Sequence, residues 1–210
     1  MILWDAPGYV VGFTTRAEGN LRAGDNAVRA CAALGLDGTR LAMNRQRHSP
    51  TVHRAEPGLR DEPGDGLWSD EPGLPMLVLG ADCLPIAIAT TDGTPALAVV
   101  HAGWRGLAEG IVAAAVSALG DDAKAAAIGP GVGPCCYEVG PEVSDLFDAD
   151  LTRNRILDLW SAAERALRRA GVATVERVDL CTRCNPDLFF SHRRSGPARG
   201  AQGVVGAVAG

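Results

Sequence analysis

The segment VVHAGWRGL, residues 99–107, ends an apolar run in a histidine and then turns through glycines that frame a tryptophan and an arginine. A second apolar stretch carries Cys83, and two more histidines, His48 and His53, lie upstream. Two His and one Cys form a borderline-soft ligand set suited to zinc, and three protein ligands leave a fourth position open. These residues indicate a catalytic metal site around His101. The alternative is packing, with Cys83 as a small hydrophobe and His101 bonded to a backbone carbonyl.

The strands that carry Cys83 and His101 must bring the two side chains together. Residues 76–103 are predicted to form two strands joined at Asp92-Gly93, because this dipeptide favours a tight hairpin turn. The hairpin would place Cys83 close to His101.

The rest of the chain mixes strand and helix patterns. Strands are predicted over residues 9–16, 125–128 and 175–181, and helices over residues 24–37, 106–120 and 157–172. Residues 56–75 are rich in Pro and Gly and weakly patterned, which predicts a long surface loop. No linker divides the chain, so we expect one α/β (α+β) domain over residues 1–210, a layered sandwich of a mixed sheet and helices.

The other cysteines give weaker signals. Cys181 and Cys184 have the spacing of a zinc or redox pair, but no second such motif accompanies them, so we expect thiols with a packing role. The vicinal pair Cys135-Cys136 lies in a segment rich in Gly and Pro and cannot easily form a disulfide with itself. It is also expected to serve packing.

Composition excludes several classes of function. The net charge of −5 and the pI near 5.4 argue against nucleic acid as a partner. Apolar stretches are too short or too interrupted for the roughly 20 residues that span a bilayer, and the first residues lack the pattern of a signal peptide. We therefore expect a cytoplasmic protein that does not enter membranes. The glycines of residues 128–134 are not followed by Lys-Ser/Thr, which excludes a phosphate-binding P-loop.

Several motifs occur in the order found in one family. They are GFTTR (12–16), QRH (46–48), ADCLPI (81–86), VVHAGWRGL (99–107), IGPGVGPCCYEVG (128–140) and DLCTRCNPDLFFSHRR (179–194). Over most of its length the chain resembles the laccase-domain family, also called the multicopper polyphenol oxidase domain or YfiH-like proteins.

This resemblance implies a ligand set and an activity. In the family, two His and one Cys bind a single zinc ion in a cleft, at positions that match His48, Cys83 and His101. The family pattern Gln-x-His, present as Gln46 to His48, selects His48 over His53. Members are described as zinc-dependent purine nucleoside phosphorylases that cleave adenosine, inosine, guanosine and methylthioadenosine to base and ribose 1-phosphate, and that also deaminate adenosine. Others are described as polyphenol oxidases or peptidoglycan editing factors. The fold is related to that of cytotoxic necrotizing factor toxins, which are Cys-His hydrolases.

Physical arguments favour some of these activities over others. A multicopper oxidase needs several copper centres, for which imidazole is a suitable ligand, whereas the chain contains only four His. Zinc needs one open site, where it can lower the pKa of bound water to about 7 for deamination. Phosphorolysis needs purine nucleosides and orthophosphate as partners and a cationic site for the phosphate. The expected substrate-binding residues are Arg16, Gln46, Arg105, Arg193 and Arg194.

Catalytic roles are expected at three positions, Cys83, His101 and Asp82. Asp82 is expected to act as a general acid for the leaving base or to orient the neighbouring ligand. Trp104 or Phe189 could stack on the purine.

Two other activities stay open. In one, Cys83 is the nucleophile and His101 the base of a hydrolase acting on an amide, such as a peptidoglycan precursor. In the other, the protein is a non-catalytic member of the family, because residues 17–30 are shorter than the family's usual segment and Arg199 matches the family's last arginine only approximately.

Overall fold

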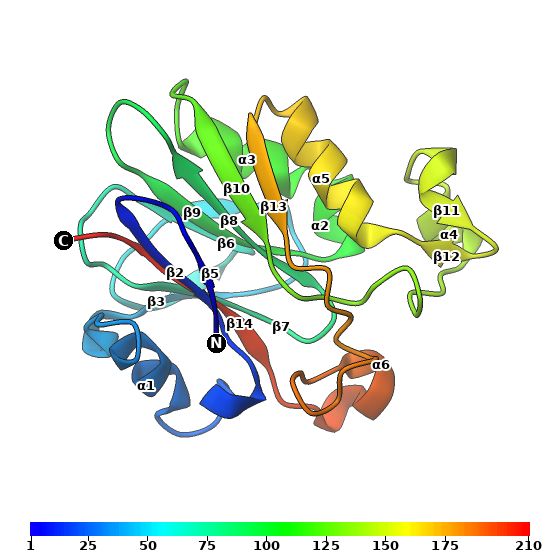
Figure 1. Ribbon diagram of the computed structural model, residues 1–210, viewed down its shortest axis with the longest axis horizontal. Coiled ribbons are helices and arrows are strands. Elements are labelled where there is room, and N and C mark those ends of the chain that lie inside the picture. The colour runs from blue at the N-terminus through cyan, green and yellow to red at the C-terminus, as the bar shows by residue number, and fades with distance from the viewer.

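Two six-stranded sheets lie face to face in the computed structural model, which describes residues 1–210 (Figure 1). The first sheet has the order β1 (Ile2–Trp4), β2 (Tyr9–Phe13), β14 (Gln202–Val208), β7 (Met76–Gly80), β3 (Ala42–Arg45), β5 (Gly58–Pro63). The second has the order β13 (Thr174–Arg177), β10 (Lys124–Ile128), β8 (Leu84–Thr90), β9 (Leu97–Ala102), β6 (Gly66–Ser69), β4 (Val52–Arg54). Both sheets mix parallel and antiparallel pairs.

Helices cover the outer faces of the two sheets. Helix α1 (Asn26–Ala32) packs on the first sheet, whereas α2 (Trp104–Ala108), α3 (Ile111–Ala118) and α5 (Leu159–Arg169) pack on the second (Figure 1). Shorter elements are α4 (Pro141–Ser144), α6 (His192–Ser195), the small hairpin β11 (Thr152–Arg153) and β12 (Ile156–Leu157), and 3₁₀ turns at Arg16–Glu18, Gly38–Arg40, Ala149–Leu151 and Gly196–Ala198. None of the helices is long and apolar enough to span a bilayer.

Strands of the inner layers are buried on both faces. In β8, Ile86 and Ile88 pack toward the helices, whereas Ala87 and Ala89 pack toward the first sheet. A strand buried on both faces reads as a continuous apolar run rather than an alternating one. This burial explains why the apolar runs of β8 and β9 stand out in the sequence, and it confirms the predicted layered α/β architecture.

The hairpin of β8 and β9 forms as predicted, but the segment that contains it has one more strand. Residues 76–80 form β7, which belongs to the first sheet, so residues 76–103 hold three strands rather than two. The chain changes sheets at Asp82, whose φ of 102° interrupts the extended backbone. The prediction of two strands was wrong because the apolar pattern continues across this break.

Two further predictions were wrong. The expected helix over residues 106–120 is two helices, α2 and α3, which separate at Gly110, where a φ of 93° breaks the helical path. The expected surface loop over residues 56–75 contains β5 and β6. Strand β6 is largely buried between β4 and β9, so its pairing partners override the Pro and Gly around it.

Candidate active site

His48, Cys83 and His101 meet at one end of the second sheet. Cys83 immediately precedes β8, His101 lies near the end of β9, and the antiparallel pairing sets Pro85 opposite His101. His48 comes from the loop after β3, and its ring lies 4.8 Å from that of His101, centroid to centroid. One potential ligand atom from each of the three residues lies within 4.8 Å of the others. The structure therefore brings together the three residues predicted as metal ligands.

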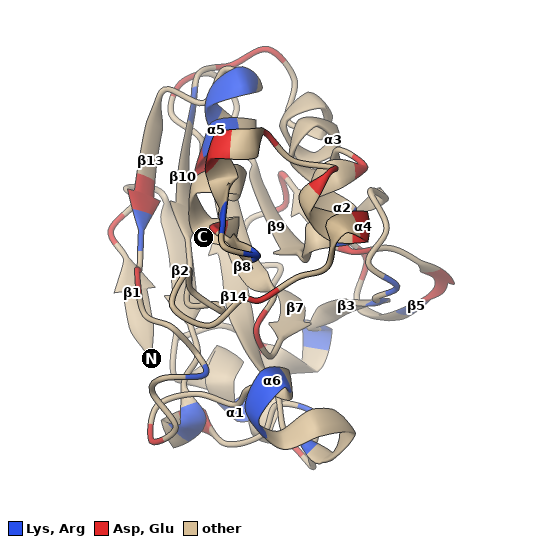
Figure 2. Ribbon diagram, turned by 90° about the vertical axis from the view of Figure 1, so that its right-hand side faces the viewer, with Lys and Arg blue, Asp and Glu red and all other residues tan.

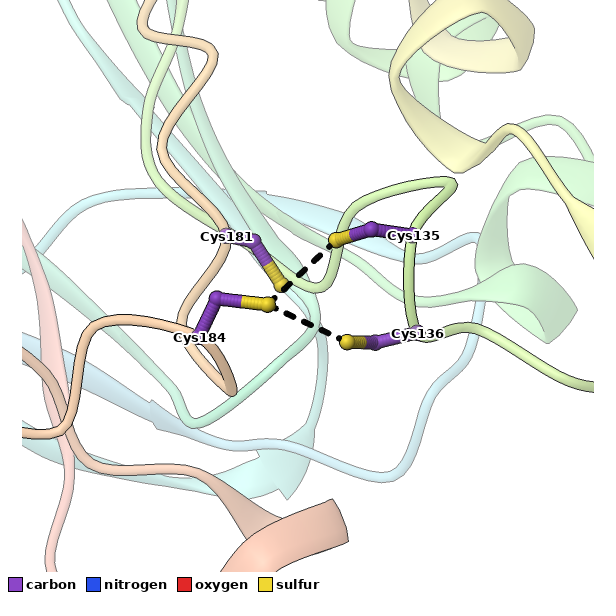
Figure 3. A group of neighbouring side chains, drawn as sticks. All are labelled: Cys135, Cys136, Cys181 and Cys184. Carbon is purple, nitrogen blue, oxygen red and sulfur yellow. Dashed lines mark hydrogen bonds between the residues drawn. The ribbon is translucent and has the colours of Figure 1, made fainter.

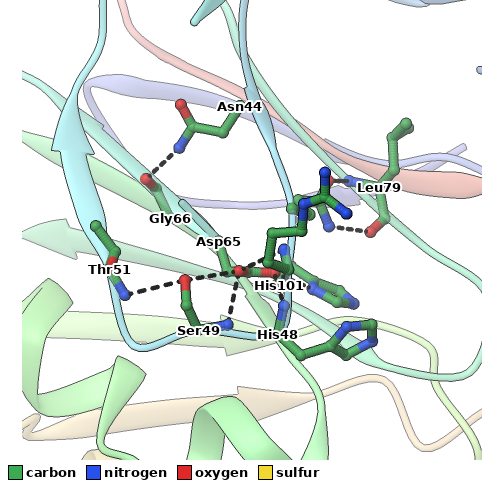
Figure 4. A network of polar contacts seen from close by, with 10 residues as sticks. Asn44, His48, Ser49, Thr51, Asp65, Gly66, Leu79 and His101 are labelled. Carbon is green, nitrogen blue, oxygen red and sulfur yellow. Dashed lines mark hydrogen bonds and ion pairs between the residues drawn. The ribbon is translucent and has the colours of Figure 1, made fainter. Parts of the chain in front are cut away.

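The buried carboxylate of Asp65 organises two of these ligands. It lies 2.8 Å from Nδ1 of His101, and it accepts hydrogen bonds from the backbone N–H groups of Arg47, His48 and Ser49 at 2.7–2.9 Å (Figure 4). With Nδ1 bonded to a carboxylate, Nε2 of His101 is the ring nitrogen available to a metal. Burial opposes ionisation of Asp65, but these hydrogen bonds and the charge of His101 outweigh it and hold its pKa well below the usual range.

Sequence reasoning missed Asp65. It stands between two glycines, in the segment that was expected to be a surface loop. Nothing in that local pattern separates a buried carboxylate from the acidic residues around it, because its partners come from residues 47–49 and from β9.

Cys83 and His101 perturb each other's ionisation. Burial raises the pKa of the Cys83 thiol, but the facing His101 and His48 outweigh burial and lower that pKa to about 6. For His101, burial lowers the pKa, whereas the Cys83 sulfur and Asp65 raise it to about 9. The arrangement stabilises a thiolate at Cys83, which is the form that binds metal or attacks a carbonyl.

The backbone around the ligands is tightly constrained. A Cβ atom on Gly103 would lie 2.9 Å from the Cys83 sulfur and 3.0 Å from the His48 ring, so only glycine fits there without a shift. His48 and Asp82 both have positive φ, 61° and 102°. Such conformations cost energy in residues other than glycine and often mark functional sites. One expected ligand, His48, and the residue that precedes another, Asp82 before Cys83, thus have unusual backbone geometry.

Asp82 is held by the chain itself. One of its carboxylate oxygens accepts a hydrogen bond from the Thr182 hydroxyl at 2.6 Å, and the other accepts one from the backbone N–H of Arg193 at 2.7 Å. This pairing ties the residue beside Cys83 to the segment that leads into α6. Of the two roles expected for Asp82, the geometry favours orienting the site.

A cavity of about 350 Å³ opens beside the cluster, and two of its three residues, His48 and Cys83, line it. Its apolar wall includes Trp104, Tyr137 and Leu159. Its basic side is formed by three residues in or just after α6, His192, Arg193 and Arg199. Basic residues gather on α6 in Figure 2. The cavity thus joins a ligand cluster, an aromatic wall and a cationic edge.

The structure places only some of the expected substrate-binding arginines at the cavity. Arg193 lines the cavity, where its guanidinium stacks over the Tyr137 ring at 4.8 Å and donates to the Glu138 carbonyl oxygen. Arg16 and Arg105 do not line it, and they stack on the rings of Phe190 and Trp104.

Two more of the expected substrate-binding side chains bind the chain's own backbone. Arg194 donates to the carbonyl oxygens of Thr182, Arg183 and Phe189, and Gln46 exchanges two hydrogen bonds with Leu79. Neither residue lines the cavity.

Of the two aromatic residues considered for stacking, Trp104 lines the cavity, whereas Phe189 is completely buried in the protein interior. A ligand in the cavity can therefore reach Trp104 and not Phe189.

The fold and the site together define a class of protein, namely an α/β sandwich in which a His-Cys-His cluster lies beside a cleft. Residues 13–208 match the family described as multi-copper polyphenol oxidoreductase laccase, and the chain belongs to this family. The family resemblance seen in the sequence is thereby confirmed.

Relatives and solved structures agree with this assignment. A Pseudomonas aeruginosa protein named purine nucleoside phosphorylase PA4543 is 33% identical over 91% of each chain. An Escherichia coli protein named purine nucleoside phosphorylase YfiH is 35% identical over 62% of this chain and 58% of its own length. The crystal structures of NMB0706 from Neisseria meningitidis and YlmD from Geobacillus stearothermophilus, each 28% identical, superpose with TM-scores of 0.84 and 0.85. They cover 99% and 98% of this chain and 97% and 94% of their own.

Proposed function

We propose that the cleft holds a zinc ion and cleaves purine nucleosides by phosphorolysis, with deamination of adenosine as a second activity. The observation that carries the proposal is the His48-Cys83-His101 cluster on a cavity that also has an aromatic wall and cationic side chains. Relatives named purine nucleoside phosphorylases support the same reaction. Adenosine, inosine, guanosine and methylthioadenosine are the proposed substrates, and the cytoplasm is the proposed location.

The donor set favours zinc over copper. A His₂Cys copper centre of the electron-transfer type commonly adds a weak axial methionine. All three methionines of this chain pack elsewhere: Met76 lies between the sheets, and Met1 and Met43 pack near α1. Zinc held by His48, Cys83 and His101 would keep one coordination position open and act as a Lewis acid there.

The cationic edge fits the phosphate substrate. In phosphorolysis an oxygen of orthophosphate bonds to C1′ of the ribose while the bond from C1′ to the purine nitrogen breaks. The electron pair of that bond leaves with the base, which takes up a proton. The Arg193 guanidinium donates a hydrogen bond from one terminal nitrogen to the Glu138 carbonyl oxygen, and it carries further N–H donors that can bind an anion in the cavity. Arg199 and His192 line the same cavity.

The opposite wall fits the base. Trp104, Tyr137 and Leu159 present apolar and aromatic surface suited to a planar purine. Burial and the nearby charge of Cys83 raise the pKa of Tyr137 despite the opposing effect of Arg193. The Tyr137 hydroxyl therefore stays protonated at neutral pH and is available as a hydrogen-bond donor to the substrate.

Product analysis of adenosine tests the proposal. Purified protein should release adenine and ribose 1-phosphate only when phosphate is present, and inosine with or without it. His48→Ala should abolish both activities, whereas His53→Ala should keep them, because the half-buried His53 ring bonds only the Pro63 carbonyl oxygen and does not line the cavity. Adenine release that does not depend on phosphate, or no turnover by zinc-replete protein, would contradict phosphorolysis.

A Cys-His hydrolase of the kind found in cytotoxic necrotizing factor toxins is the second candidate. It is favoured by the lowered pKa of Cys83 beside His101. In this reaction the Cys83 sulfur attacks an amide carbonyl, the C–N bond breaks and His101 gives a proton to the leaving amine. Water then hydrolyses the resulting thioester, which releases the acid and regenerates Cys83. A nucleophilic Cys83 need not hold stoichiometric metal. Amide hydrolysis by metal-free protein, with no nucleoside turnover, would select this candidate.

A further inference from the structure

The four cysteines that were expected to serve packing form one cluster. Cys135 and Cys136 lie in the loop after β10, and Cys181 and Cys184 lie in the segment after β13 (Figure 3). All four sulfur atoms lie within 4.8 Å of one another, with Cys184 3.2 Å from Cys136 and 3.5 Å from Cys135. The sequence gives no sign that the two pairs meet, because the two loops that carry them lie about 45 residues apart in the chain.

We propose that these four thiols bind a second metal ion, zinc, in a closed four-thiolate site. A tetrahedral zinc ion with Zn–S bonds of about 2.3 Å requires sulfur atoms about 3.8 Å apart. The observed separations of 3.2 and 3.5 Å, with none above 4.8 Å, need only small side-chain adjustments to reach that geometry. Four protein ligands leave no open position, so this site would be structural rather than catalytic.

Local geometry supports ligation by Cys181. The backbone N–H of Gly133 donates a hydrogen bond to its sulfur at 3.3 Å, across the gap between the two loops. N–H groups aimed at sulfur stabilise a thiolate. Cys181 and Cys184 are separated by two residues, which is the common spacing for two ligands of one structural zinc.

Metal binding explains the cluster better than disulfides do. The four sulfur atoms converge on one point, with Cys184 in contact with both Cys135 and Cys136, which is the arrangement expected of four ligands around one ion rather than of two separate disulfides. The sulfur separations of 3.2 and 3.5 Å are well above the roughly 2.05 Å of a disulfide bond. Cys135 and Cys184 are exposed, which gives an ion a path to the site, and an all-thiolate set selects soft or borderline metals.

The four-cysteine site would also stabilise the cleft. Tyr137 follows Cys136 directly and lines the cavity. Thr182, between Cys181 and Cys184, donates its hydroxyl to Asp82 and its carbonyl accepts from Arg194. A metal ion joining the two loops would therefore hold the aromatic wall and the α6 segment at fixed positions beside the first site.

Metal content and cobalt spectra of the full chain test this inference without any activity assay, so its failure is distinguishable from failure of the proposed function. Wild-type protein purified without chelator should contain two zinc ions per chain. Cys135→Ser with Cys184→Ser, both at exposed positions, should contain one, held by the first site. Cys83→Ser should also contain one, held by the four-cysteine cluster. Cys31→Ala is the matched control, because Cys31 lies in the core away from both sites, and it should keep two.

Cobalt substitution identifies the ligands. Cobalt-loaded Cys83→Ser should show the strong sulfur-to-metal charge-transfer bands of a four-thiolate centre, and the Cys135→Ser, Cys184→Ser protein should lack that intensity. Three results would each overturn the inference: one zinc per wild-type chain, with the double variant unchanged; disulfides among the four cysteines in metal-free native protein; or iron with inorganic sulfide in place of zinc.

Discussion

The carboxylate of Asp65 contacts Nδ1 of His101 at 2.8 Å and, through the same oxygen, accepts the backbone N–H of His48. One buried side chain thus positions two ligands that lie 53 residues apart in the chain (Figure 4). Its second oxygen accepts the N–H groups of Arg47 and Ser49 and the Ser49 hydroxyl. The geometry of the proposed metal site therefore depends on a residue that is not one of its expected ligands.

Asp65→Asn should weaken metal binding at the first site. In either orientation of the asparagine amide, its NH₂ group faces at least two N–H donors and cannot accept hydrogen bonds from them. At least one of the hydrogen bonds that orient His48 and His101 is therefore lost. Replacing such a supporting residue typically lowers metal affinity about 10- to 100-fold. Competition with a chelator measures the change. Asp61→Asn is the control, because Asp61 is exposed and pairs only with Arg45. Equal zinc affinity in both variants would show that Asp65 does not position the ligands.

Gly103→Ala should disturb the first site while the fold survives. The new methyl group would lie 2.9 Å from the Cys83 sulfur and would displace the side chains of the cluster. The φ of −83° at this position suits alanine, so the backbone itself should not be strained. We expect metal affinity to fall by roughly 10-fold or more, the scale on which ligand misplacement acts. Gly106→Ala in α2 is the matched control, because its nearest contact would be an ordinary 3.4 Å. Wild-type zinc affinity in Gly103→Ala would contradict the close approach.

Thr182→Val tests whether Asp82 positions the site. The substitution removes the 2.6 Å hydrogen bond from the Thr182 hydroxyl and leaves a buried carboxylate oxygen without a partner. We expect a loss of about 1–3 kcal/mol in the free energy of unfolding. Thr174→Val, at an exposed position of β13, should have little effect. Urea denaturation measures both. If Thr182→Val is as stable as wild type but has strongly reduced turnover, the result would instead indicate that Asp82 acts as a general acid.

Local signals predicted that two members of the His48-Cys83-His101 cluster, Cys83 and His101, lie close together. The Asp92-Gly93 turn and the apolar runs beside it fix the antiparallel pairing of β8 and β9, and that pairing places Cys83 near His101. His48 was selected by the family pattern and not by any local structural signal, since its position depends on the loop that Asp65 holds.

Features that depend on long-range pairing escaped the sequence reasoning. Strand β14 pairs with β2 and β7, which are more than 120 residues away, and β6 is recognisable only through its neighbours β4 and β9. The four-cysteine cluster depends on the parallel pairing of β10 with β13, which brings the loops after these strands together. Neither pair of cysteines indicates the other in the sequence. The physical reason is the same in each case, since these contacts are made between segments whose own patterns are weak.

Position relative to the cavity separates two arginines that are expected from the sequence to bind substrate, Arg105 and Arg193. Arg105 follows His101 closely and lies near the start of a helix, and both features favour it for the phosphate site. In the structure its guanidinium stacks on Trp104 outside the cavity lining, whereas Arg193 lines the cavity. We therefore expect phosphate binding to depend mainly on Arg193.

Arg193→Lys should raise the KM for phosphate with a smaller effect on adenosine deamination, which uses no phosphate. Lysine keeps the charge but loses the planar pair of donors that binds a phosphate through two hydrogen bonds. Hydrogen bonds to charged groups contribute about 1.5–3 kcal/mol, which corresponds to a roughly 10- to 100-fold rise in KM. The backbone N–H of Arg193 that holds Asp82 is untouched by the substitution, so the fold around Cys83 should persist, and thermal melting checks this. Arg105→Lys, measured in parallel, should change the KM for phosphate by less than about 3-fold. A larger rise in the KM for phosphate in Arg105→Lys than in Arg193→Lys would indicate that Arg105 binds the phosphate. Equal losses of both activities in an Arg193→Lys protein that melts like wild type would remove Arg193 from phosphate binding.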